Sequence, residues 1–213
     1  MENINLTYSE IMYLFADKFI SQRAKLANME KHPTGEKIPV KPLGNLMATV
    51  ALVFLKEKGY ISLSIKDVKN LFIFPGKDVF ATKLKEATSD SPDALSGIEL
   101  KLLNNIGDDY KVRSAVYYLL SNDETLPWGH IIHISKRSLV EKGYLNTTEE
   151  KKLLRTVTKY SINSEKAAAA EALIPVVNKA LADFSETGEV YKLSLRAIEG
   201  GIASRQEHED SSD

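Results

Sequence analysis

Four histidines and the absence of cysteine limit the chemistry that this sequence could support. His130 and His133 stand three residues apart, so they would share one face of a helix, as two metal ligands often do. A zinc site needs a third ligand and usually a fourth, and no His-Glu-x-x-His pattern or suitably spaced carboxylate accompanies the pair. The lack of cysteine also excludes disulfides, thiolate-metal sites and thiol nucleophiles. We therefore expect no metal site.

Motifs that bind nucleotide phosphates or hold a catalytic nucleophile are also missing. Two stretches, 34–37 and 75–78, combine glycine with lysine, but neither is the Gly-x-x-x-x-Gly-Lys-Ser/Thr loop. The sequence has no Gly-x-Gly-x-x-Gly and no Gly-x-Ser-x-Gly. It therefore predicts a non-enzymatic protein without catalytic residues or cofactors. An enzyme would require the fold to bring distant carboxylates or histidines together.

A basic segment in the first third of the chain is the leading candidate for a binding surface. From Lys18 to Lys58 there are eight lysine or arginine residues against three glutamates, a local surplus of +5 within a chain of net charge −1. Such a segment can contact an anionic lipid surface, although the simpler interpretation is a solvated loop. The candidate lipid- or anion-binding residues are Arg23, Lys25, Lys31, Lys37 and Lys41.

A second interpretation comes from a helix, a glycine turn and a hairpin that follow one another, which is the outline of a winged helix. A DNA-binding winged helix would use Lys136 and Arg137 on its last helix, with Lys151, Lys152 and Arg155 near the wing. However, that helix is largely apolar and the net charge is not basic. Nucleic-acid binding is therefore the alternative hypothesis, and a module that only packs or oligomerises is a third.

The elements that must position these residues follow from periodicity and turn signals. A capping box, Thr7–Glu10, starts a helix to about Ala27, and a loop over 29–42 leads into a second helix, Leu43–Lys58, that is apolar on nearly every side. After it we expect a hairpin over 60–65 and 70–74, and helices over 77–87, 94–105 and 110–120. The last expected elements are a helix containing Trp128 that ends at Gly143, a strand or hairpin over 153–162, an alanine-rich helix over 164–184 interrupted at Pro175, and a helix over 190–198.

One phrase occurs twice and predicts the same local structure each time. Leu55–Ile61 and Leu139–Leu145 both run from an apolar helix through Lys-Gly-Tyr into an aliphatic residue. Gly59 and Gly143 can adopt the positive φ that ends a helix, and the tyrosine that follows can start a strand. The chain should therefore twice build a helix that turns sharply into an extended segment.

Together these features predict a mainly α fold, in which one helical domain, residues 1–203, surrounds a buried central helix and carries one or two winged-helix-like β-hairpins. Residues 204–213 should form a disordered acidic tail. No apolar run is long enough to cross a bilayer, and the N-terminus lacks the features of a secretory signal. We therefore expect a cytoplasmic protein that could still associate with a membrane surface.

The order of these stretches resembles the Golgi phosphoprotein 3 family. The resemblance spans Leu6 to Phe184 and rests on four stretches, which are 6–10, 52–63, 75–84 and 139–149 followed by 153–162. It implies a mostly helical fold around a hydrophobic central helix. It also implies a peripheral membrane adaptor that binds phosphatidylinositol 4-phosphate through a basic pocket, and a hairpin, here 153–162, that supports self-association or insertion into the membrane.

The binding residues of that family do not carry over to this chain. Ala48, Gly129 and Ile132 stand where the family has the arginines of its binding pocket. The tryptophan in the family's binding loop has no counterpart, since the only tryptophan of this chain is Trp128. The resemblance is thus to a divergent member, for which a prokaryotic origin is one interpretation, and it assigns headgroup binding to no named residue. We expect the basic segment to meet an anionic membrane surface, a phosphoinositide or a protein partner.

Overall fold

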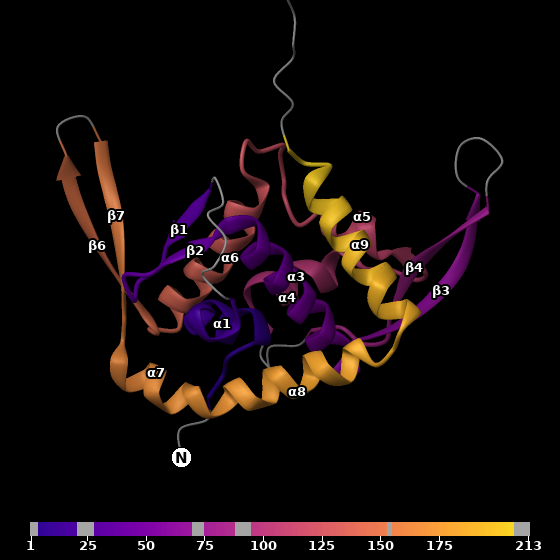
Figure 1. Cartoon of the computed structure of the whole chain (residues 1–213), viewed down its shortest axis with the longest axis horizontal. Helices are drawn as coiled ribbons and strands as arrows, with labels where there is room; N and C mark the ends of the chain where they lie inside the picture. The colour runs from indigo at the N-terminus through magenta and orange to yellow at the C-terminus, as the bar shows by residue number, and fades with distance from the viewer. Residues whose placement is uncertain (1–3, 21–27, 70–74, 88–94, 153–154, 207–213) are drawn as a thin grey trace, which may run out of the picture.

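Helix α3 (Val40–Glu57) lies at the centre of the molecule, with the other helices arranged around it (Figure 1). The computed structural model describes residues 4–20, 28–69, 75–87, 95–152 and 155–206. Twelve of the 18 residues of α3 are buried. A helix that is apolar on nearly every side can be stable only in such a central position.

Helices from both halves of the chain cover α3. The helices that pack on it are α1 (Tyr8–Leu14), α4 (Gly97–Asn105), α6 (Pro127–Glu141), α8 (Ile174–Ser185) and α9 (Glu189–Ala203). Shorter helical pieces connect them, namely α2 (Ala16–Phe19), α5 (Val112–Tyr117), α7 (Ser164–Ala170) and the 3₁₀ turn η1 (Glu171–Leu173). One contiguous set of buried apolar side chains extends from Leu6 to Ile202.

Three antiparallel sheets are present in the described part of the chain. The first pairs β1 (Met29–Lys31) with β2 (Lys37–Pro39). The second joins β3 (Ile61–Lys69), β4 (Pro75–Lys83) and β5 (Tyr110–Lys111) in that order. The third pairs β6 (Leu145–Lys152) with β7 (Arg155–Ile162). The long hairpins β3–β4 and β6–β7 project from opposite sides of the helical core (Figure 1).

The fold is therefore mixed α and β, and the prediction of a mainly α protein with one or two hairpins is wrong. Helices account for 54% and strands for 22% of the structure, with seven described strands in the three sheets. The segment 29–42, expected to be a loop, contains β1, β2 and the first turn of α3. The segment 77–87, expected to be a helix, contains most of β4.

The error at β4 has a simple physical cause. Val79, Phe80 and Leu84 fit helical spacing, but a local pattern of this length fits a strand equally well. In the structure Val79 and Ala81 are buried, whereas Asp78 and Phe80 are partly exposed, which is the two-residue alternation of a strand. All nine residues of β4 pair with β3, so a tertiary partner decides the conformation.

The first helix begins as expected and ends early. Thr7 and Glu10 form the reciprocal capping box, in which the Thr7 N–H donates to Glu10 Oε2 at 2.8 Å. The helix breaks at Phe15, which has φ −120° and ψ 35°, and α2 ends at Phe19. The rest of the expected helix, 21–27, lies outside the described residues, as does the expected strand 70–74.

Both copies of the repeated phrase adopt the predicted structure. Gly59 has φ +67° and Gly143 has φ +73°. The N–H of the tyrosine that follows donates back to the carbonyl of Leu55 in the first copy and of Leu139 in the second, at 2.8 Å each. These bonds close the helix ends in the manner of a Schellman motif, and β3 or β6 begins at once.

The C-terminal part agrees with the expected order of elements. The region around Pro175 divides the alanine-rich segment into α7 and α8, and α9 follows. Residues 204–206 of the expected tail are described, and residues 207–213 lie outside the described part. Arg205 stacks on Tyr117 and pairs with Asp123.

Within the described ranges, no helix combines the length and apolar character needed to cross a bilayer.

Gly44 supports a prediction about the crossing of α3 and α6. A Cβ at Gly44 would lie 2.9 Å from Trp128 Cβ and 3.0 Å from the Trp128 carbonyl oxygen. Gly44→Ala should therefore lower the free energy of unfolding by about 1–3 kcal/mol through overpacking, despite the better helix propensity of alanine. Urea unfolding followed by circular dichroism measures the change. Gly107→Ala, where nothing lies within 4 Å of the added Cβ, is the matched control. Equal stability of the two variants would contradict the close crossing.

Candidate functional site

The candidate basic residues fall into three groups in the structure. Lys31 and Lys37 are exposed register partners across β1 and β2. Lys41 follows in the first turn of α3. Arg23 and Lys25 lie outside the described residues. The structure thus brings Lys31 and Lys37 directly together and places Lys41 beyond the other end of the same short hairpin.

Like charges face one another across the β1–β2 hairpin. Directly opposed residues of an antiparallel pair have Cβ atoms about 5 Å apart and side chains on the same face, and two like charges in this position destabilise the pair. Lys31 and Lys37 occupy such a position. An anion that binds between their ammonium groups would remove this repulsion.

A buried histidine attaches the hairpin to the helical core. His32 Nε2 lies 2.8 Å from the carbonyl oxygen of Tyr13, which can only accept, so Nε2 carries the proton and Nδ1 accepts from the Thr34 hydroxyl at 2.8 Å. Burial lowers the pKa of His32 below its ordinary value of 6.5. The imidazole is therefore neutral near pH 7, and it fixes the turn that carries the two lysines onto the end of α1.

Lys41 has an aromatic and an acidic neighbour. Its Nζ lies 5.2 Å from the centroid of the Trp128 ring, a cation–π distance, and 2.8 Å from Glu199 Oε1 on α9. Both side chains of the ion pair are more than half exposed, so the pair contributes little stability. An anionic ligand could replace Glu199 at a small energetic cost.

Trp128 and Asn45 give this region a fixed shape. The indole Nε1 donates to Asn45 Oδ1 at 2.7 Å, which directs the NH₂ group of the Asn45 amide away from the indole. The two residues border an open cavity of about 580 Å³ between the first turns of α3 and the start of α6. Its other lining residues are Asn28, Lys41, Pro42, Leu126 and Gln206. Sequence analysis placed Trp128 on the helix that ends at Gly143, without a binding role, and did not single out Asn45.

The residues of the nucleic-acid hypothesis do not form one exposed surface. Lys136 is mostly buried; it pairs with Glu30 and lies over the rings of Tyr13 and Tyr160 at 5.7 and 4.8 Å. Arg137 and Lys151 are exposed. Lys152 and Arg155 are register partners at the end of the β6–β7 hairpin, and their side chains lie outside the described part. Nucleic-acid binding and self-association through 153–162 stay predictions.

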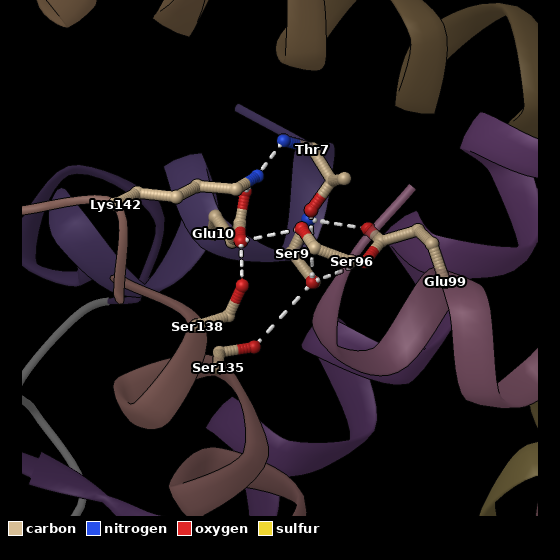
Figure 2. A network of polar contacts seen from close by, with 8 residues as sticks. All are labelled: Thr7, Ser9, Glu10, Ser96, Glu99, Ser135, Ser138 and Lys142. Carbon is tan, nitrogen blue, oxygen red and sulfur yellow. Dashed lines mark hydrogen bonds and ion pairs between the residues drawn. The ribbon is translucent and has the colours of Figure 1, made fainter. Parts of the chain in front are cut away.

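A second polar cluster lies inside the molecule (Figure 2). Glu10 of α1 is fully buried and accepts four hydrogen bonds. The donors are the Thr7 N–H at 2.8 Å, the Ser96 hydroxyl at 2.8 Å, the Ser138 hydroxyl at 2.5 Å and Lys142 Nζ at 2.8 Å. Because these donors come from α1, the start of α4 and the end of α6, the carboxylate connects three elements.

Glu99 of α4 is the other buried carboxyl of this cluster. Ser9 approaches it twice, with its N–H 2.9 Å from Oε1 and its hydroxyl 2.7 Å from Oε2. The Ser9 hydroxyl also lies 3.4 Å from that of Ser135. Burial, and then the charge of Glu10, raise the pKa of Glu99 to about 7. The cluster is enclosed by helices, so we assign it to the interior rather than to a ligand.

The histidine pair, His130 and His133, lies near the start of α6. His130 Nδ1 lies 2.9 Å from Glu124 Oε1, and His133 is exposed one turn away. No group of three histidine, cysteine, aspartate or glutamate residues in the described ranges could hold a metal ion.

Comparison with protein-family models, with curated proteins and with solved structures finds no match to this chain. The resemblance to the Golgi phosphoprotein 3 family therefore stays a prediction.

The Glu10–Lys142 ion pair yields a prediction about stability. The Lys142 side chain is 18% exposed and Glu10 is fully buried, so Lys142→Met leaves a buried carboxylate without its cation. This should lower the free energy of unfolding by about 3 kcal/mol, and Glu10→Gln in the same chain should restore part of the loss. Urea unfolding of both variants measures this coupling. Lys101→Met, at an exposed position on α4, controls for the loss of a lysine. A double variant as unstable as the single one would contradict the pairing.

Proposed function

We propose that this chain is a non-enzymatic adaptor that binds an anionic membrane surface through Lys31, Lys37 and Lys41. In this proposal the cavity beside Trp128 receives a phosphate-bearing lipid headgroup. The observation that carries the proposal is the arrangement of Lys41, Trp128 and Asn45 in the lining of that cavity. The resemblance stated above points to the same class of function.

The side chains at the cavity have the chemistry that a phosphate requires. An ammonium group supplies charge, and the oriented NH₂ group of Asn45 supplies neutral hydrogen-bond donors. The indole of Trp128 offers an apolar wall against which a sugar-like or acyl portion could pack. The exposed Lys31 and Lys37 would add attraction to the surrounding anionic lipid.

The proposal explains the uneven charge of the chain. A net charge of −1 gives no general attraction to anionic surfaces, so binding must rely on a local group of lysines. Each basic residue close to an anionic bilayer contributes about 1 kcal/mol, and the three lysines together about 3 kcal/mol. This is enough for reversible association that weakens as salt increases.

Liposome flotation tests the surface part of the proposal. The triple variant Lys31→Gln, Lys37→Gln, Lys41→Gln should bind vesicles of 30% phosphatidylserine about 100-fold more weakly than the unaltered chain, from three losses of about 1 kcal/mol each. The control triple variant Lys101→Gln, Lys179→Gln, Lys192→Gln removes the same charge from exposed positions on α4, α8 and α9. An equal loss of vesicle affinity in both triple variants would show that binding depends on net charge and not on Lys31, Lys37 and Lys41 in particular. No flotation of the unaltered chain at low salt would refute the membrane role and favour a protein partner.

The single tryptophan allows a separate test of the cavity. A soluble inositol phosphate that enters it should change the fluorescence of Trp128 in a saturable way, because the indole borders the cavity. Lys41→Gln should weaken the response about tenfold or less, whereas Lys101→Gln should leave it unchanged, since one charge contributes about 1 kcal/mol. Flotation without any fluorescence response would limit the proposal to general surface attraction.

A further inference from the structure

The two buried carboxyls of the internal cluster are not equivalent. Glu10 has a cation, Lys142, and three further donors on its two oxygens. Glu99 has Ser9 as its hydrogen-bonding residue and no cation in the described part of the chain. A buried carboxylate without a counter-charge is strongly disfavoured, so the site as built suits one negative charge at Glu10 and a neutral acid at Glu99.

We propose that the protonated carboxyl of Glu99 is a pH-sensitive latch that holds α4 against α1 and α6. The proposal does not depend on membrane binding. The Ser9 hydroxyl donates to Oε2 of an ionised Glu99 at 2.7 Å. When Oε2 carries a proton this bond reverses, so that the acid O–H donates to the Ser9 oxygen and the Ser9 hydroxyl can donate to Ser135 (Figure 2). When the proton is lost to solvent, two buried carboxylates face each other across α1 and α4, and Lys142 pairs with Glu10 alone.

The charged groups on every element packed against α4 support this assignment. From α1 the facing charge is Glu10, and from α6 it is Lys142, which is already bound to Glu10. The buried face of α3 is apolar apart from Thr49, whose hydroxyl donates to a carbonyl of its own helix. On α5, Arg113 is directed to Ser204 near the end of α9. Among the described residues, none of these elements supplies Glu99 with a cation of its own.

The latch should act on α4 in particular. The start of this helix is tied to the cluster at two places, by Ser96 to Glu10 and by Glu99 to Ser9. Ionised Glu99 is tolerated once α4 separates and water reaches the carboxylate. Opening of α4 is therefore the motion that relieves the repulsion.

The direction of the pH effect follows from the raised pKa. In the closed form the pKa of Glu99 is about 7, because of burial and then the charge of Glu10, and in the open form it returns to about 4.5. Below pH 4.5 both forms hold the proton, and above pH 7 neither does. Between these values only the closed form holds it, so opening becomes about tenfold easier per pH unit, on the order of 100-fold in total.

Hydrogen exchange of the full chain at pH 5 and pH 8, corrected for intrinsic exchange, tests the latch. Glu99→Gln keeps the shape of the neutral acid and cannot ionise. At pH 5 the α4 amides of Glu99→Gln should exchange at about the same corrected rate as those of the unaltered chain. At pH 8 they should exchange on the order of 100-fold more slowly than those of the unaltered chain, because α4 opens less often in the variant. Glu165→Gln, at an exposed position on α7, should match the unaltered chain at both values. No pH-dependent difference in α4 between Glu99→Gln and the unaltered chain would overturn the proposal.

Infrared spectroscopy reads the proton directly. The spectrum of the unaltered chain minus that of Glu99→Gln at pH 6 should show the carbonyl stretch of a protonated carboxylic acid, which should disappear as the pH rises beyond 7. A carboxylate signal at pH 6 would refute the latch even if Glu99→Gln altered the exchange of α4 for structural reasons.

Discussion

The burial of α3 on every side is the constraint on which the rest of the structure depends. A helix with apolar residues around its whole circumference is stable only when several elements cover it, because one neighbouring helix covers only one side. α1, α4, α6, α8 and α9 together provide this cover, although they are separated by most of the chain. The hairpins begin or end where the chain leaves this core, which is why β3 and β6 follow directly on the helix-ending Gly59 and Gly143.

Apolar cover alone does not fix how each short helix is rotated about its axis. The cluster of Glu10 and Glu99 supplies that information, because its hydrogen bonds form only when particular faces of α1, α4 and α6 meet. Buried polar groups that lack partners are costly, so a rotated helix would lose more than packing contacts. The cluster therefore contributes to the choice of one arrangement even though a buried ion pair adds little net stability over apolar residues of the same size.

Sequence reasoning succeeded where the signal is local and failed where a distant partner decides. The capping box at Thr7 and the two glycine stops depend on neighbouring residues, and the structure has them as expected. The strand β4 depends on β3, and the same apolar spacing also fits a helix. Glu99 carried a signal that was overlooked, since a carboxylate on the apolar face formed by Ile98 and Leu102 must find buried partners. The partner that it finds, Ser9 on α1, follows from the fold alone.

The candidate binding site is also a product of core packing. Gly44 has no side chain, so the start of α6 approaches α3 closely enough for Trp128 to reach Asn45. Lys41 lies four residues before Asn45, one turn away on the same face of α3, and this spacing brings its ammonium group over the indole. A lysine on a free loop would attract every anion alike, through its charge alone. Lys41 instead stands beside an aromatic wall and an oriented amide, so a ligand that fits all three groups gains affinity that charge alone does not provide.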